Sequence, residues 1–418
     1  MSVESRAPLP PGIPQVFSGP LLENPYPLYA SLRASSPVFQ LPIPADVGAG
    51  VFLLTRHADV HQALRDARLS ADRRRSHAIA RNRQVLPRQV MGEEGLFRSM
   101  LMMDPPDHTR VRGLVNKAFT PRRVAELRPH IETIAKSLLA EPAAARKLDV
   151  IGEFSAPLPA IVIAELLGVP AEDHPQFRRW AAAIVAAPTA IASGTEVLAA
   201  QRAIESLNDY LRAVIAERRA QPRNDLISAL VAAQEDRDAL SDAELLATSL
   251  LLLLAGHETT TNLIGNGTLA LLRHPDQLAR LRAEPELLKS AIEEMLRWDS
   301  PVQGTLRAVT EDVEIGAVTL RQGALVIAGI GAANRDPAVF PEPDRFDVAR
   351  RDNRHLSFGF GAHFCLGAPL ARLEAEIAFR ALLEAFPKLA LSGAPISHRP
   401  NPILRGLQAL EVASESPS

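Results

Sequence analysis

The chain has a single cysteine, Cys365, among its 418 residues. An intrachain disulfide is therefore impossible, and folding does not require an oxidising compartment. The chain also lacks an excess of either charge, because 46 Lys and Arg stand against 48 Asp and Glu and give a formal net charge of −2. This balance predicts no nucleic-acid partner and no attraction to an anionic membrane surface.

Long hydrophobic stretches are also scarce. The longest, 245–255, is interrupted by Thr248 and Ser249, and it is shorter than the roughly 20 residues that a membrane-spanning helix needs. The sequence opens with MSVESRAPLPPGIPQ, which has no apolar core behind positive charge. We therefore expect no signal peptide and no membrane anchor, and we expect a cytoplasmic protein.

The composition itself is that of an ordinary globular protein, with 47% hydrophobic and 22% charged residues. The interior of the chain contains neither a low-complexity linker nor a repeat of solenoid length. We therefore expect one domain over 1–418, with a loose N-terminal segment at 1–20, and a monomeric protein.

Helical patterns outnumber strand patterns, so a mainly α fold with small β sheets is expected. The longest helix should cover 241–273, because Ser241 and Glu244 form a capping box and Pro275 ends the helix. A helix so long and so apolar should run through the middle of the molecule. Other expected helices include 107–119, 121–139, 154–167, 195–219, 286–298 and 366–385, and expected strands are 51–55, 305–309, 313–315 and 325–329.

The lone cysteine stands in Phe358-Gly-Phe-Gly-Ala-His-Phe-Cys-Leu-Gly367. Gly359 and Gly361 allow positive φ and a close approach of the backbone to a flat cofactor. A helix that starts directly after Cys365 would stabilise a thiolate through its dipole and its free N–H groups. A lone cysteine is more often a small buried hydrophobe, but these surroundings favour a thiolate that binds a metal.

These ten residues resemble the haem-binding signature of the cytochrome P-450 superfamily. The resemblance implies that Cys365 is the proximal iron ligand, that His363 contacts a haem propionate, and that the cofactor is haem b. Motifs in that family's order extend over about 24–412, and the soluble bacterial class with macrolide and natural-product hydroxylases is the most similar. The implied fold is a single triangular, mainly α domain with a long central helix and small β sheets.

Glu294 and Arg297 lie three residues apart on an expected helix. Taken alone, such a pair is usually a surface ion pair worth a few tenths of a kcal/mol. Its position resembles the Glu-x-x-Arg element of the same family, which implies a structural role in supporting the cysteine loop. By the resemblance a further arginine completes the network, and Arg345 and Arg350 are both candidates.

The sequence Ala255-Gly-His-Glu-Thr-Thr260 lies in the middle of the longest expected helix. A zinc-protease motif is excluded, because Thr261 stands where the second histidine would be required. A structural reading of Thr259 is a hydrogen bond to a carbonyl one turn earlier. The resemblance implies instead that Thr259 is the alcohol beside activated oxygen and that Glu258 is an acid that delivers protons, a chemically apt pair.

His108 and Arg112 are separated by one helical turn and therefore share a face. Alone they would be read as a solvated face, although an arginine can bind a carboxylate in bidentate fashion. Their surroundings, Asp104-Pro-Pro-Asp-His-Thr-Arg-Val-Arg112, resemble the propionate-binding helix of the family. Arg307, within an expected strand, resembles the other propionate arginine.

The resemblance also implies where a substrate binds. A hydrophobic small molecule is expected, such as a macrolide, terpenoid, steroid-like compound or fatty acid, in a mostly apolar pocket. The expected lining residues are Leu101, Leu251, Leu252, Ala255, Val302, Leu306, Ile403 and Leu404.

The implied reaction is hydroxylation or epoxidation with dioxygen. The sequence has no Gly-x-Gly-x-x-Gly flavin or nicotinamide fingerprint. Electrons are therefore expected from a separate ferredoxin and its ferredoxin reductase. The ferredoxin is expected to dock on basic residues near 110–123. Two alternatives are a peroxide-using or coupling haem-thiolate enzyme and a non-catalytic relative that recruits partners. The Glu258–Thr259 pair argues against a dedicated peroxide user, and the intact Cys365 argues against the non-catalytic relative.

Overall fold

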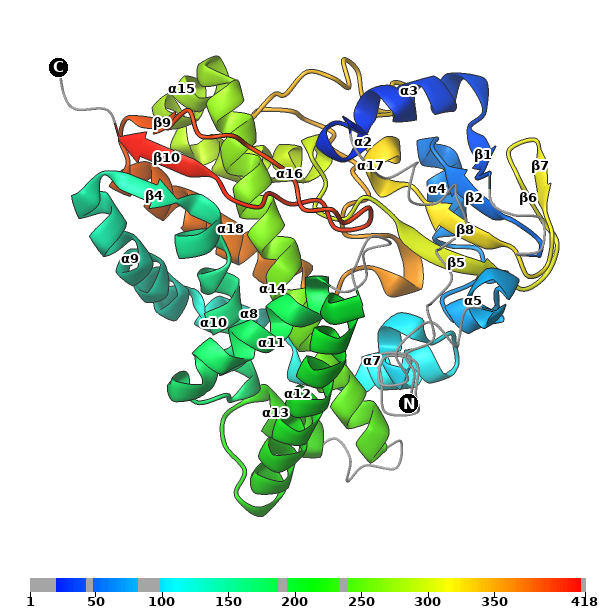
Figure 1. Cartoon of the computed structure of the whole chain (residues 1–418), viewed down its shortest axis with the longest axis horizontal. Coiled ribbons are helices and arrows are strands. Elements are labelled where there is room, and N and C mark those ends of the chain that lie inside the picture. Colours follow the sequence, from blue (N-terminus) through cyan, green and yellow to red (C-terminus); the bar gives the residue numbers. More distant parts are fainter. Residues whose placement is uncertain (1–19, 43–47, 82–97, 187–193, 233–239, 415–418) are drawn as a thin grey trace.

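The computed structural model describes residues 20–42, 48–81, 98–186, 194–232 and 240–414. The segment expected to be loose, 1–20, lies outside these residues except for Pro20. Figure 1 shows an outline that narrows towards α12 and α13, with most helices on one side and the larger sheet on the other. The helices near the larger sheet are α2 (Pro20–Glu23), α3 (Tyr26–Ser35), α4 (His57–Ala63), α5 (His77–Arg81) and α17 (Ile330–Ala333). The other α-helices are α7 (Asp107–Ala118), α8 (Pro121–Glu126), α9 (Arg128–Ala145), α10 (Pro157–Leu167), α11 (His174–Ala186), α12 (Gly194–Ala220), α13 (Leu226–Ala232), α14 (Asp242–Arg273), α15 (Pro275–Ala283), α16 (Leu288–Trp298) and α18 (Ala368–Ala385).

The long helix α14 confirms the expectation for 241–273. The Ser241 hydroxyl accepts a hydrogen bond from the Glu244 N–H at 3.2 Å, and the Glu244 carboxylate accepts one from the Ser241 N–H at 2.8 Å. Most side chains of α14 are buried all around the helix, as a helix through the centre of a protein requires. Residues near its middle therefore reach the interior.

Among the boundaries that differ from expectation, two have local reasons. The segment 121–139 is not one helix, because α8 ends at Glu126 and α9 begins at Arg128. Pro129 lies in the first turn of α9 and has no N–H, so it cannot donate the backbone hydrogen bond that would continue α8. Proline is tolerated at the start of a helix, where that N–H has no partner in any case. The helix after the cysteine, α18, begins at Ala368, two residues later than expected, with Gly367 as its N-cap.

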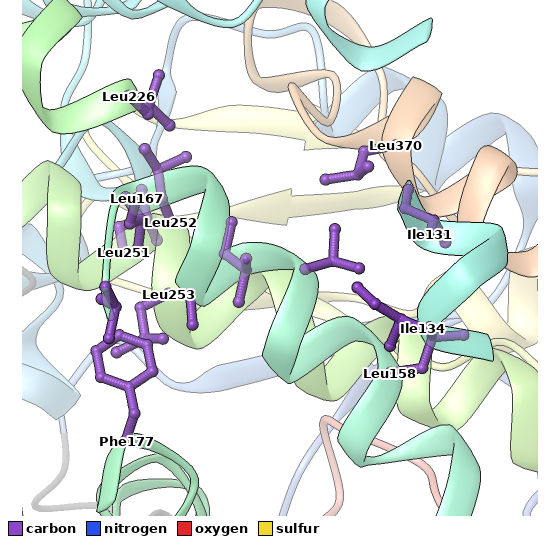
Figure 2. Close-up of a cluster of buried hydrophobic side chains, with 14 of the residues drawn as sticks. Ile131, Ile134, Leu158, Leu167, Phe177, Leu226, Leu251, Leu252, Leu253 and Leu370 are labelled. Atoms are coloured by element: carbon purple, nitrogen blue, oxygen red, sulfur yellow. The ribbon is translucent and has the colours of Figure 1, made fainter. Parts of the chain in front are cut away.

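The main hydrophobic core lies where α9, α10, α11, α13 and α18 pack around α14. Figure 2 shows part of it, with Leu251, Leu252 and Leu253 of α14 among side chains from the surrounding helices. Each fully buried side chain of this size contributes about 1.5–3 kcal/mol. The stretch Val150–Leu167 is apolar and long enough to cross a membrane, but 67% of it is buried inside the protein, which is the placement of a core helix.

The largest sheet has the strand order β1-β2-β8-β5-β3. Only β2 and β8 pair in parallel among these neighbours, and β5 lies between β8 and β3 with Ala308 opposite Ser70. The remaining strands form a sheet of order β4-β10-β9 and a β6–β7 hairpin. The bounds are β1 (Val38–Gln40), β2 (Val51–Leu54), β3 (Leu69–Ser70), β4 (Lys147–Asp149), β5 (Thr305–Val309), β6 (Val313–Ile315), β7 (Val318–Leu320), β8 (Leu325–Ala328), β9 (Leu389–Leu391) and β10 (Glu411–Ser414).

Candidate active site

A large cavity lies between α14, β5 and the cysteine loop. Its empty volume is about 1530 Å³, the open mouth included. Side chains expected to serve one site, although far apart in sequence, all line this cavity: His108, Arg112, Thr259, Arg307, His363 and Cys365. The fold therefore brings together the expected thiolate, the expected carboxylate ligands and the hydroxyl of α14.

The loop before Cys365 is shaped by its glycines. Gly359 and Gly361 have φ of +71° and +72°, a left-handed conformation that favours glycine. A Cβ at Gly361 would also lie 2.9 Å from the Leu64 carbonyl oxygen. The loop closes through a 2.8 Å hydrogen bond from the Cys365 N–H to the Phe358 carbonyl, which directs the sulfur into the cavity.

The electrostatics at Cys365 combine two opposing influences. Burial raises the pKa of the thiol, whereas backbone N–H groups of Gly367 and Ala368 and the charge of Arg112 lower it. The Cys365 side chain is exposed to the open cavity. A thiolate stabilised by N–H donors at a helix start is a suitable ligand for an iron ion.

Glu294 and Arg297 form a fully buried ion pair instead of a surface pair. Both side chains have 0% exposure, and the two nitrogen–oxygen distances are 2.7 and 2.8 Å. Arg350 is the third partner, because its Nε lies 3.0 and 3.1 Å from the Glu294 oxygens. Arg345 contributes only its carbonyl, which accepts a hydrogen bond from Arg297 at 3.1 Å.

Asn334 connects this ion pair to the cysteine loop. Its carbonyl accepts a hydrogen bond from Arg297 at 3.0 Å, and its side-chain amide donates to the Ser357 hydroxyl at 2.8 Å. Ser357 directly precedes Phe358, whose carbonyl holds the Cys365 N–H. The Glu294–Arg297 pair is therefore connected to the cysteine backbone by hydrogen bonds through Asn334 and Ser357 and by the peptide bond between Ser357 and Phe358.

The two histidines of the cavity lie against each other, with ring centroids of His108 and His363 4.1 Å apart. Burial, together with Arg307, His108 and Arg112, lowers the pKa of His363 to about 3. Burial and Arg112 also lower the pKa of His108. Both rings are therefore neutral hydrogen-bonding groups in the neutral pH range.

The polar groups at this end of the cavity fit an anionic cofactor. His108 Nε2 is buried and has no hydrogen-bond partner among the described residues. Burial lowers the pKa of Arg307 to about 10, so its guanidinium remains charged at neutral pH without full solvation. Buried donors and cations of this kind require an anion, and the carboxylates of a haem would supply it.

Comparison with known proteins supports the same conclusion. The family model Cytochrome P450 matches residues 50–401. The chain is 47% identical over 369 residues to Cytochrome P450 107B1 of Saccharopolyspora erythraea, covering 87% of this chain and 89% of that protein. The chain belongs to the cytochrome P450 family. It is 44% identical to Vitamin D(3) 25-hydroxylase of Pseudonocardia autotrophica, with 95% of each chain covered.

The fold comparison agrees with the family assignment. Myxobacterial cytochrome P450 CYP267B1 in complex with myristic acid matches with a TM-score of 0.88 at 41% identity, covering 97% of this chain and 100% of that chain. The chain is therefore a cytochrome P450 monooxygenase with the mainly α fold that the cysteine motif implied. Membership also implies a haem-thiolate cofactor, which the cavity at Cys365 fits.

In this P450, Thr259 and Glu258 occupy different sides of α14. Thr259 lines the cavity, and its hydroxyl donates to the Ala255 carbonyl at 3.0 Å. The Glu258 carboxylate, only 6% exposed, is instead held by Arg399 at 2.6 Å. Asn262 donates a second hydrogen bond to it at 3.3 Å. Sequence reasoning missed Arg399, which has no motif of its own and is far from α14 in the chain.

The apolar wall of the cavity includes Leu101, Leu251, Leu252, Ala255 and Val302 as expected. It also includes Met100, from the loop around 96–103 that was expected to line it, and residues that the sequence did not indicate, among them Phe119 and Ile163. Ile163 packs close to the backbone of α14 because the facing residue is Gly256. A Cβ at Gly256 would lie only 3.0 Å from Ile163 Cγ1.

Three expected pocket residues do not line the cavity. Side chains alternate along a strand, so Thr305 and Arg307 of β5 face the cavity while Leu306 packs against the separate cluster around Leu53 and Ile327. The segment with Ile403 and Leu404 pairs through its backbone with 302–303 and leaves Val302 as the lining residue. His355 is hydrogen-bonded to Glu293 at 3.0 Å and does not line the cavity.

Glu374 is a further residue that sequence reasoning missed. It lines the cavity on α18 with 1% exposure, and both carboxylate oxygens lack a hydrogen-bond partner among the described residues. Burial raises its pKa to about 8. Helical periodicity could have placed it in the interior, because Leu370 is four residues before it on the same face.

Proposed function

We propose that this P450 hydroxylates or epoxidises a hydrophobic small molecule of the macrolide, terpenoid, steroid-like or fatty-acid type, with haem b as cofactor. The observation that carries the proposal is one apolar-walled cavity with Cys365 at one side and Thr259 at another. The relatives support this substrate range, since one is named for vitamin D(3) and another was solved with myristic acid.

In the proposed mechanism, the bound haem supplies oxygen activation. Cys365 would hold its iron as a thiolate, and His108, Arg112, Arg307 and His363 would bind its carboxylates. The apolar wall holds a substrate C–H or C=C bond near the iron and excludes bulk water. One atom of dioxygen enters the substrate, while the other leaves as water after uptake of two electrons and two protons.

Protons would reach the cavity through Glu258 and Thr259. The Arg399 side chain that holds Glu258 is 31% exposed, so this carboxylate connects to the solvent side of α14. Rotation of the Glu258 side chain would carry a proton past the helix towards the Thr259 hydroxyl. Thr259 would release its bond to Ala255 and present that hydroxyl to oxygen, a proton transfer typically worth about 10²–10⁴ in rate.

The absorption spectrum of the dithionite-reduced, carbon monoxide-bound protein tests the cofactor assignment. We expect a strongly red-shifted Soret band for the wild type, because a thiolate donates electron density to iron. Cys365→Ser should lose that band, since no other cysteine can replace it. A Soret band at the position of ordinary haem proteins in the wild type would refute thiolate ligation.

Substitution of Thr259→Ala tests the proton route. We expect haem binding to be unchanged, product formation to fall by about 10²-fold, and reducing equivalents to appear as hydrogen peroxide. Thr268→Ala is the matched control, because Thr268 also donates to a carbonyl one turn earlier on α14, at 2.8 Å, but does not line the cavity. Unchanged coupling of electron use to product in Thr259→Ala would exclude the assigned role.

We further propose that electrons come from a ferredoxin and its reductase, and that the protein works as a cytoplasmic monomer. Arg122 on α8 is a suitable docking residue, because its side chain is 89% exposed and its ion pair with Glu126 is a surface pair. Arg110 is less suitable, since its guanidinium binds Glu244.

Charge reversal tests the docking proposal. Arg122→Glu should slow reduction by an acidic ferredoxin at low ionic strength, and the difference from wild type should shrink as salt screens the attraction. Arg321→Glu, at an exposed ion pair after β7, is the control and should leave the rate unchanged. Equal rates for all three proteins at low salt would contradict docking at α8.

A further inference from the structure

The 3₁₀ turn Arg73–Arg75 places one arginine close enough to Arg307 of the cavity wall for the two charges to interact. This turn follows β3 and packs against β5, the strand of Arg307. The Arg73 carbonyl accepts hydrogen bonds from the Ser76 N–H at 3.1 Å and the Ser76 hydroxyl at 2.9 Å. Asp72 binds Arg74 with both oxygens, at 2.7 and 2.9 Å. The backbone of Arg73 is therefore held in place, and the adjacent Asp72 is paired with Arg74.

The Arg73 guanidinium has no hydrogen bond or ion pair among the described residues, and its Nε is buried without a partner. Burial and the neighbouring charge of Arg307 lower the pKa of Arg73 to about 10, so it is still charged at neutral pH. A half-buried guanidinium whose Nε has no partner is costly to desolvate, and a like charge beside it adds to the cost. Such a pair of arginines indicates a site for an anion.

The charges around this end of the cavity can be counted. Arg73, Arg112 and Arg307 contribute three positive charges, and Asp104, which acts on both Arg307 and His108, contributes one negative charge. Asp104 is already bonded by the Ser70 hydroxyl and by the Ala71 N–H. Two positive charges remain uncompensated, and haem carries two carboxylates.

We propose that Arg73 is a third cationic ligand of the haem carboxylates, acting beside Arg307. The proposal rests on the haem site of the proposed function and adds a residue from a 3₁₀ turn that no recognised motif marks. Without Arg73, the same count would leave one carboxylate uncompensated in a buried site. The carboxylate of a fatty-acid substrate has the same chemistry, so the experiment must separate the two sources.

The experiment compares Arg73→Gln, Arg73→Lys and the control Arg75→Gln, which alters an exposed arginine of the same turn. The readouts are the rate of haem transfer from the ferric protein to apomyoglobin and the midpoint potential of the substrate-free protein. We expect Arg73→Gln to lose haem about tenfold faster, corresponding to one lost charge-assisted bond, and to have a lower midpoint potential. Arg73→Lys should restore most of both properties, and Arg75→Gln should match the wild type.

Several outcomes would overturn the proposal. Unchanged haem transfer in Arg73→Gln, with weaker binding of myristic acid but not of its methyl ester, would assign Arg73 to a substrate carboxylate. Haem loss that Arg73→Lys does not restore would indicate damage to the turn instead of a lost charge. A wild type without the red-shifted carbon monoxide band would refute the haem-thiolate proposal itself, so the two failures are distinguishable.

Discussion

Replacement of Glu294 by alanine should lower the free energy of unfolding by about 3–5 kcal/mol, because it leaves buried cations without their carboxylate. Arg297 has 0% exposure and Arg350 only 11%. Glu294 also accepts hydrogen bonds from the Asp347 N–H at 3.0 Å and from Asn353 at 3.2 Å. One substitution therefore removes the centre of a network that organises the segment before the cysteine.

The same substitution should release haem, because the network reaches Cys365 through Asn334 and Ser357. Urea unfolding followed by tryptophan fluorescence would measure the loss of stability, and the carbon monoxide spectrum would measure the loss of thiolate-bound haem. Glu126→Ala is the control, since its ion pair with Arg122 is exposed and should be worth less than about 1 kcal/mol. Similar midpoints for the two variants would mean that the buried network does not support the fold.

The parts of the fold and of the site that could be predicted from the sequence depend on residues close together in the chain. The capping box at Ser241 and Glu244 defines the start of α14 because both partners lie within one turn. The glycines around Cys365 are equally local. Glu294 and Arg297 were also found, but their complete burial was not visible in the spacing, which is the same for a surface pair.

Features that depend on distant segments were not predictable in the same way. Arg345 and Arg350 are both plausible from sequence, and only the path of the chain at 343–350 decides that one offers a carbonyl and the other a guanidinium. Arg399 reaches Glu258 from a segment with no motif. Leu306 shows a different limit, because alternation along β5 could have excluded it once Arg307 was assigned to the cavity.

Glu374 gives the second prediction with a large effect. Its carboxyl group is buried without hydrogen bonds among the described residues, and burial raises its pKa from 4.5 to about 8. Below pH 4.5 the carboxyl is protonated in both the folded and the unfolded chain, so stability is unaffected. As pH rises from 4.5 to 8, the unfolded chain loses this proton while the folded protein keeps it, so stability falls.

Glu374→Gln should remove this pH-dependent cost, because an amide of similar shape does not ionise. We expect the variant to match the wild type near pH 4.5 and to be more stable by about 3 kcal/mol at pH 7. Urea midpoints measured at several pH values would test this, with Glu384→Gln, at an exposed position on α18, as the control. That control should stay within about 0.5 kcal/mol of the wild type throughout.

The pH dependence separates burial of a proton from a simple packing effect. A stabilisation of Glu374→Gln that is equal at pH 5 and pH 8 would come from packing and would contradict a raised pKa. A gain that grows steadily with pH and levels off near pH 8 would show that the folded protein carries a neutral carboxylic acid at the cavity wall. Because this acid lies on α18 at the wall of the cavity, its burial is the physical cause of the raised pKa.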